Sequence, residues 1–208
     1  MDLCAAEDST TILATCAGAR KQRQLWEPGP NAPRCSVIEP QRVRDMETLQ
    51  PTQTPVAKTG MLIRKPVADV FTAFVEPEIT TKFWFTKSSG RLESGKQVKW
   101  EWEMFGSSTH LTVKALEPNR RIVIEWQGYS GPTIVEWKFT RMDAGTFVTI
   151  TESGFTGDGD ELIKYVSTSG QGFSWTLAGL KALLEHGIRL NLVADRFPNG
   201  PRHPYPDE

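Results

Sequence analysis

One carboxylate stands out among the residues that could do chemistry, because its strand pattern places it on an apolar face. In residues 146–153, Val148, Ile150 and Glu152 alternate with polar residues, and alternate residues of a strand point to the same side. A carboxyl group between apolar walls suits general acid or base chemistry, or the binding of a ligand hydroxyl. The alternative is that Glu152 lies at the strand end, where it reaches solvent or pairs with a cation.

A dense set of aromatic residues is the second feature. The chain has seven tryptophans, and six of them lie between Trp84 and Trp175. We predict that an apolar pocket with few polar groups is lined by these residues: Phe74, Trp84, Trp100, Trp102, Trp126, Trp137, Glu152, Phe155, Phe173 and Leu177. The alternative is that the rings fill the core, which the pattern alone favours because a buried Trp packs well. Both outcomes can hold for different residues.

The sequence lacks the common motifs of metal and nucleophile chemistry. His110, His186 and His203 are not at the spacing of a metal site or a catalytic triad, so we interpret them as surface residues. There is no GxSxG, HExxH or P-loop motif. Residues 158–160 (DGD) resemble part of a calcium loop without its other ligands, and we expect a solvated loop that caps the following helix. We therefore predict neither a metal nor a cofactor.

Composition bounds the class of protein. The chain has 208 residues and a net charge of −1, which gives no reason to expect nucleic acid or an acidic membrane surface as partner. No apolar run approaches the roughly 20 residues that span a bilayer. Cys4, Cys16 and Cys35 all precede residue 40, without a CxxC motif, which argues against a disulfide framework and a zinc site. The acidic first residues do not fit a secretory signal, so we expect a cytoplasmic protein.

Residues 1–56 differ from the rest of the chain. They are rich in proline and show no sustained period of 2 or 3.6, so we expect a largely disordered N-terminal extension. Met46 begins METLQPTQTP, which looks like a natural start. One hypothesis is that residues 1–45 come from a misassigned start codon, and the alternative is a genuine regulatory or targeting tail.

Periodicity predicts the elements that would position these side chains. We expect a first strand at residues 57–64, a helix with Pro66 at its first position, a short helix from Pro77 and a loose tail over residues 193–208. A meander of antiparallel strands follows the two helices, at residues 97–105, 109–116, 121–126, 133–140 and 146–153. In the first of these strands, Met104 shares the tryptophan face. Glutamates fall on the opposite, solvated face: Glu101, Glu103, Glu125 and Glu136.

The last predicted element of the domain is a long helix over residues 172–187. Phe173, Leu177, Leu180 and Leu184 form its apolar face, and Gly187 is a plausible stop. An antiparallel meander has one face to bury, so this helix is expected to cover it. Lys181 and Glu185, four positions apart, form a pair on the polar side of the helix.

These segments resemble a known superfamily. The order of elements resembles the START-like helix-grip superfamily, also called SRPBCC or Bet v-like, over residues 57–192. Three stretches carry the resemblance: IRKPVADVFTAF, TITESGF and GFSWTLAGLKALLEHG. The branch most similar is the C-terminal domain of the activator of heat-shock-protein-90 ATPase, often described as polyketide-cyclase-like. Phe173 stands where the closing helix of such proteins often has Trp, although Trp175 is close by.

The resemblance implies an α+β fold with a seven-stranded antiparallel sheet wrapped round the C-terminal helix. Two short helices follow the first strand, and a cavity lies between sheet and helix. It implies that a small apolar or aromatic molecule, such as a lipid or polyketide, binds in this cavity. A cyclase or hydrolase that uses Glu152 as acid or base is one alternative. A module that contacts a chaperone, or another copy of the chain as a homodimer, is another.

Overall fold

A computed structural model describes residues 54–128 and 130–199 of the chain. The expectations for residues 1–53 and 200–208 lie outside these described residues. Within them, no helix is both long and apolar enough to cross a membrane.

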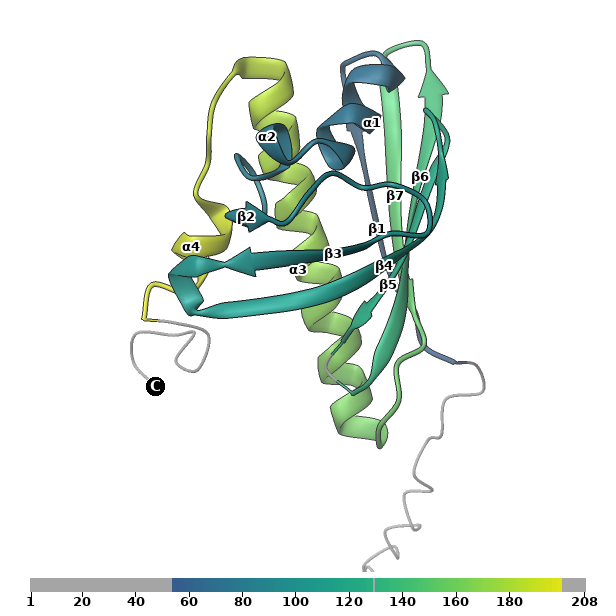
Figure 1. Ribbon diagram of the computed structural model, residues 1–208, viewed down its shortest axis with the longest axis vertical. Coiled ribbons are helices and arrows are strands. Elements are labelled where there is room, and N and C mark those ends of the chain that lie inside the picture. Colours follow the sequence, from purple (N-terminus) through teal and green to yellow (C-terminus); the bar gives the residue numbers. More distant parts are fainter. Residues whose placement is uncertain (1–53, 129, 200–208) are drawn as a thin grey trace, which may run out of the picture. The chain divides into compact units, whose positions relative to one another are not determined.

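Seven antiparallel strands form one curved sheet, which confirms the α+β fold class (Figure 1). The strands follow the order β1-β7-β6-β5-β4-β3-β2 across the sheet. Their bounds are β1 (Ala57–Ile63), β2 (Lys87–Ser88), β3 (Gln97–Trp102), β4 (Ser107–Glu117), β5 (Arg121–Gln127), β6 (Pro132–Met142) and β7 (Gly145–Ser153). The expected strands are all present, and the two-residue β2 is the one that the sequence did not predict.

The helices lie on the inner side of this sheet. They are α1 (Val67–Val75), α2 (Pro77–Thr80), α3 (Gly159–His186) and α4 (Leu192–Arg196), with a 3-10 turn η1 (Glu103–Phe105) between β3 and β4. Figure 1 shows the sheet curving round α3, with α1 and α2 near the end where β1 stops. Pro66 is the N-cap residue of α1, whereas the sequence predicted it at the first helical position. The helix-grip arrangement is therefore the one that the resemblance implied.

The start of α3 corrects the sequence prediction. The helix begins at Gly159, not at Gly172, and Asp158 caps it by accepting a hydrogen bond from the Glu161 amide at 3.2 Å. Gly170 and Gly172 lie inside the helix, and glycine has a low helix propensity, so the periodic apolar pattern could be read with confidence only beyond them. The predicted end is confirmed, because Gly187 adopts a left-handed conformation with φ of 67°.

The end of β3 is a second correction. The strand stops at Trp102, and the next residues turn through η1, so strand alternation does not reach Met104. Met104 is 42% exposed and does not share the buried face with Trp100. Glu101, Glu125 and Glu136 follow the prediction for the outer face, because they are partly exposed and pair with neighbouring cations, as in Lys114–Glu125 at 3.3 Å. Glu103 is exposed but lies in η1, beyond the strand alternation. Such exposed pairs contribute only about 0–1 kcal/mol each.

A short helix occupies the segment after α3. The sequence did not predict α4, which begins where the loose tail was expected. Phe197, its C-cap residue, makes edge-on ring contacts with Phe105 of η1 and Trp175 of α3, with centroids 5.6 and 6.1 Å apart. The guanidinium of Arg196 lies 5.5 Å from the Trp175 ring centroid, within the range of a cation–π contact.

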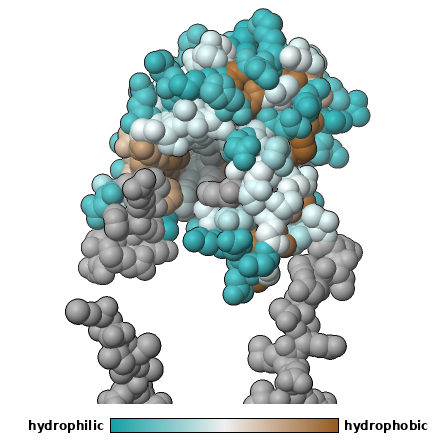
Figure 2. Space-filling model, turned by 60° about the horizontal axis from the view of Figure 1, so that its bottom comes forward, coloured by the Kyte–Doolittle hydropathy of each residue, from teal (hydrophilic) through white to brown (hydrophobic). Residues whose placement is uncertain are grey.

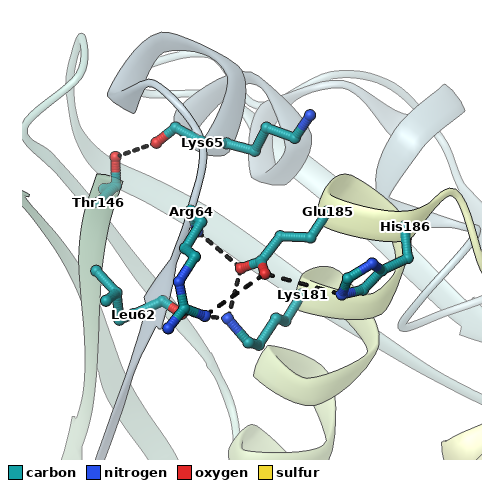
Figure 3. A network of polar contacts seen from close by, with 7 residues as sticks. All are labelled: Leu62, Arg64, Lys65, Thr146, Lys181, Glu185 and His186. Carbon is teal, nitrogen blue, oxygen red and sulfur yellow. Dashed lines mark hydrogen bonds and ion pairs between the residues drawn. The ribbon is translucent and has the colours of Figure 1, made fainter. Parts of the chain in front are cut away.

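A carboxylate joins the C-terminal end of α3 to the segment after β1 (Figure 3). Glu185 is 8% exposed and accepts hydrogen bonds from the Arg64 amide at 2.7 Å and the Lys181 ammonium at 2.5 Å. Lys181 also donates to the Leu62 carbonyl at 2.9 Å. The Lys181–Glu185 pair therefore does not lie on a solvated side of the helix, as the sequence suggested. It faces β1 and fixes the helix to the sheet.

This polar cluster also sets the protonation of Glu185. Burial raises the pKa of Glu185, but the hydrogen bonds from the Arg64 amide and Lys181, together with their positive charges, outweigh it and hold the pKa below its usual value. A group whose pKa is lower in the folded state contributes stability above its unfolded pKa, which for Glu is about 4.3. That contribution is lost as the pH falls through the folded pKa.

We predict that Glu185→Gln lowers the free energy of unfolding by about 1–3 kcal/mol at pH 7, because charge-assisted hydrogen bonds are lost. The difference from the wild type should shrink as the pH falls below the unfolded pKa of about 4.3 and through the lower pKa of folded Glu185, where the carboxylate becomes protonated. Urea unfolding at pH 7 and at a pH below the folded pKa measures this. Glu93→Gln is the matched control, since Glu93 makes an exposed pair with Lys96 and should change little. An equal loss at both pH values would contradict the assignment.

Candidate binding site between sheet and helix

Glu152 lies on the inner face of β7 and is 2% exposed. Its strand neighbours Val148 and Ile150 are fully buried on the same face, as alternation predicts. The alternative in which Glu152 reaches solvent from the strand end is therefore wrong. The carboxylate is held inside the molecule, between the sheet and α3.

Three neutral donors from three elements surround this carboxylate. Trp126 of β5 donates its indole N–H to Oε1 at 2.8 Å, and Thr133 of β6 donates its hydroxyl to the same oxygen at 2.5 Å. Ser169 of α3 donates its hydroxyl to the other oxygen, Oε2. The Trp126 N–H also lies 2.9 Å from the Thr133 hydroxyl oxygen. One side chain therefore bonds to two other strands and the helix.

The electrostatic setting of Glu152 differs from that of Glu185. In residues 54–128 and 130–199, the ion pairs found do not include Glu152, whereas Glu185 has Lys181 within 2.5 Å. Hydrogen bonds from neutral groups stabilise a buried carboxylate less completely than a cation does. A carboxylate accepts about four hydrogen bonds, and three are in place. Glu152 can therefore accept a further hydrogen bond from a bound molecule, or exchange a proton with it.

A cluster of aromatic rings fills the space beside Glu152. Trp84 lies in its middle and contacts five other members of the predicted set, with ring centroids 4.9–6.5 Å away: Trp100, Trp102, Trp126, Trp137 and Phe173. Phe173 stacks on Trp126 with an interplanar angle of 18° and a centroid distance of 6.1 Å. Most of these rings are buried, so the deep part of the predicted pocket is packed with side chains.

Two tryptophans lie at the border of this cluster. Trp102 and Trp126 are only partly buried, although both pack against the core. The end of the molecule where α3 begins, at the bottom of Figure 1, is turned towards the viewer in Figure 2 and is hollowed there. The walls of the hollow are mostly pale, which is the colour of intermediate hydropathy.

The remaining predicted site residues separate into two groups. Phe74 and Leu177 belong to the same core, where Phe74 lies 6.0 Å from Trp137 between ring centroids and Leu177 is fully buried on α3. Phe155 does not join them. It packs with Ala57 and Leu162 in a separate small cluster near the start of α3.

Sequence reasoning missed Ser169 and Thr133. Ser169 lies four residues before Phe173, so both are on one face of α3. The signal was hidden because the helix was expected to begin only at Gly172. Thr133 lies opposite Trp126 in the β5–β6 register, and this pairing could have been found by aligning the two predicted strands.

Two surface depressions of the described residues are formed mostly by other residues, although Trp126 lines the smaller one. One, with a volume of about 600 Å³, is lined by the β1–α1 connection and the β6–β7 hairpin, including Arg64, Lys65 and Arg141. Another, of about 260 Å³, lies over β3, β4 and β5 and includes His110 and Glu125. Within the described residues, no group of three His, Cys, Asp or Glu side chains is placed to hold a metal ion.

Solved structures share this fold. A protein from Staphylococcus saprophyticus, SSP2350, is 32% identical, with a TM-score of 0.59, and the match covers 66% of this chain and 96% of that one. DynU16, a putative protein in the dynemicin biosynthetic locus, is 20% identical with a TM-score of 0.58, over 64% of this chain and 48% of its own. The Aha1 dimer from Colwellia psychrerythraea is 20% identical with a TM-score of 0.56, over 64% and 98%.

A search of curated proteins finds no match. A family model, described as Activator of Hsp90 ATPase homolog 1-like protein, matches residues 64–185. This range runs from the end of β1 to the last turn of α3 and contains Glu152, its three donors and the aromatic cluster. The chain therefore belongs to the Activator of Hsp90 ATPase homolog 1-like family.

Proposed function

We propose that the chain binds a small apolar or aromatic molecule between the sheet and α3. The observation that supports this best is the aromatic cluster that ends in two half-buried indoles, Trp102 and Trp126. The molecule is also hollowed at the end where α3 begins (Figure 2). Ligand sites are mostly apolar and contain a few well-placed polar groups, and Glu152 with its donors is such a group. The ligand would displace none of the buried carboxylate's three hydrogen bonds if it used the remaining acceptor position.

The experiment is native mass spectrometry of the full-length chain as purified, repeated after denaturing extraction. A small molecule that leaves the protein only on denaturation supports the proposal, and its formula names the ligand class. Bare protein, together with no thermal shift across a panel of aromatic and acyl probes, would instead favour a core that is filled by its own side chains and would end the proposal.

A mutation locates the binding. Trp102→Ala removes one aromatic wall, and an aromatic contact contributes about 0.5–1.5 kcal/mol beyond its buried area. We expect the affinity for an aromatic probe to fall by about 3- to 10-fold, measured by quenching of the tryptophan fluorescence. The control is Met142→Ala, because Met142 is an exposed apolar side chain at the C-terminal end of β6, away from Thr133 and Glu152. An equal loss in both variants would indicate adsorption to the surface instead of a site.

An enzyme with Glu152 as acid or base is the second candidate. It is favoured by the position of the carboxylate, which is buried, carries no paired cation among the described residues and lies against rings that would orient an apolar substrate. The reaction class would be proton transfer during cyclisation, dehydration or hydrolysis. The same region between the sheet and α3 would serve for binding and for chemistry.

Glu152→Gln tests this candidate in a folded protein. The amide oxygen of Gln can still accept from Trp126 and Thr133, and its NH₂ can donate to Ser169 after that hydroxyl turns. We therefore expect Glu152→Gln to lower stability by about 1 kcal/mol or less, and Glu152→Leu, which leaves three polar groups without partners, by about 3 kcal/mol or more. Thermal unfolding measures both. Turnover of any substrate found should vanish in Glu152→Gln while apolar binding stays nearly intact.

Contact with a protein partner is the third candidate, and family membership favours it. The family description names the ATPase activity of the chaperone Hsp90, and the related Colwellia protein was solved as a dimer. For this chain, both a chaperone partner and a homodimer are therefore candidates. Sedimentation of the purified chain alone and with an Hsp90-type chaperone distinguishes them. A chain that sediments as a monomer and does not bind the chaperone would contradict both candidates.

A further inference from the structure

One buried polar group in the core lacks a hydrogen-bond partner. Among the described residues, two buried side-chain nitrogens have none, Arg121 Nε and Trp137 Nε1. Arg121 Nε still lies 2.9 Å from a carboxylate oxygen of Glu136, so it is paired electrostatically. Trp137 is 1% exposed, and its indole N–H has no such acceptor.

This lone donor is unusual because the polar groups near it are satisfied. The Trp126 indole donates to Glu152 and lies close to Thr133, and Glu152 receives three donors. Thr176, buried on α3, donates to the Gly172 carbonyl at 3.0 Å. Native proteins rarely leave a buried N–H unpaired, because no hydrogen bond then offsets the cost of removing it from water. Each such group therefore requires a physical explanation.

Trp137 lies inside the proposed binding region. Its ring centroid is 6.0 Å from Trp84 and 6.3 Å from Phe173, which are two central members of the aromatic cluster. In the β6–β7 register Trp137 lies opposite Ile150 and Val135 lies opposite Glu152. Trp137 and Glu152 are therefore diagonal neighbours on the inner face, a separation of about 7–8 Å between Cα atoms. A bicyclic or tricyclic molecule spans this separation.

We propose that the bound molecule carries a neutral oxygen acceptor, such as a ketone or quinone carbonyl, which accepts the N–H of Trp137. An indole nitrogen can only donate, so the group opposite it must be an acceptor. A carboxylate would serve poorly, because Glu152 lies one diagonal step away without a paired cation among the described residues. This inference rests on the proposed function, since it names the ligand class for the same site.

Fluorenone and fluorene are suitable probes, because they are rigid tricyclic molecules that differ in one position, a carbonyl against a methylene. The full-length chain is labelled with ¹⁵N at its indole groups, and Trp137→Phe assigns the Trp137 resonance by its disappearance. Trp126→Phe assigns a second indole, whose N–H is already bonded to Glu152. Affinities for both probes are measured on the wild type and on Trp137→Phe by fluorescence quenching.

We expect fluorenone to bind the wild type about 10-fold more tightly than fluorene, and this ratio to fall to about one in Trp137→Phe. The Trp137 indole proton should move downfield with fluorenone and not with fluorene, while the Trp126 proton responds alike to both.

Three results would overturn the inference. If both probes bind but their affinity ratio is the same in Trp137→Phe, the ligand-binding function stands and the carbonyl assignment is wrong. A cross-peak between the Trp137 indole proton and a trapped water in the free protein would mean that the donor is already satisfied. If neither probe binds the wild type, the proposed apolar site fails and the inference fails with it.

Discussion

The burial of the Glu152 carboxylate is the constraint on which the arrangement of sheet and helix depends. A carboxyl group between apolar walls is tolerated only when its oxygens are hydrogen-bonded. Here the donors come from β5, β6 and α3, so the carboxylate is satisfied only when the helix is packed in its native position on the strands. The apolar cluster supplies most of the packing energy, whereas Glu152 specifies one register of α3 against the sheet.

The two ends of α3 are held in different ways. At its C-terminal end, Glu185 is bound by the Arg64 amide and a lysine, and this pairing is local and charge-compensated. In its first half, Ser169 holds Glu152 with a neutral hydroxyl, next to half-buried rings. The first arrangement suits a fixed anchor. The second leaves a carboxylate with spare accepting capacity beside apolar surface, which is the combination that a ligand can use.

Local periodicity predicted an antiparallel meander covered by a helix and placed Glu152 on its inward face, with a strand end that reaches solvent as the alternative. The seven-stranded helix-grip arrangement was implied by the resemblance. The alternation of Val148, Ile150 and Glu152 needed no knowledge of other segments. The hydrogen-bond partners of Glu152 were not predicted, because Ser169 lay in a stretch that was interpreted as a loop before Gly172. Phe155 was grouped with the other aromatics by residue type, but only tertiary packing reveals that it joins Ala57 and Leu162. The local sequence pattern predicts which residues share one face of a strand or helix. Contacts between distant segments determine which of these faces pack together.

The packing of the aromatic cluster bears on how binding would occur. Trp84, Trp100 and Trp137 are buried and in ring contact, so a ligand cannot enter the deep core without displacing side chains. Trp102 and Trp126 are only partly buried, and their displacement exposes less additional apolar surface to water. Entry would therefore begin at these two residues and proceed past Phe173, which stacks on Trp126 and touches Trp137. Phe173 is thus the side chain whose rotation would connect the half-buried Trp126 to the unpaired donor of Trp137.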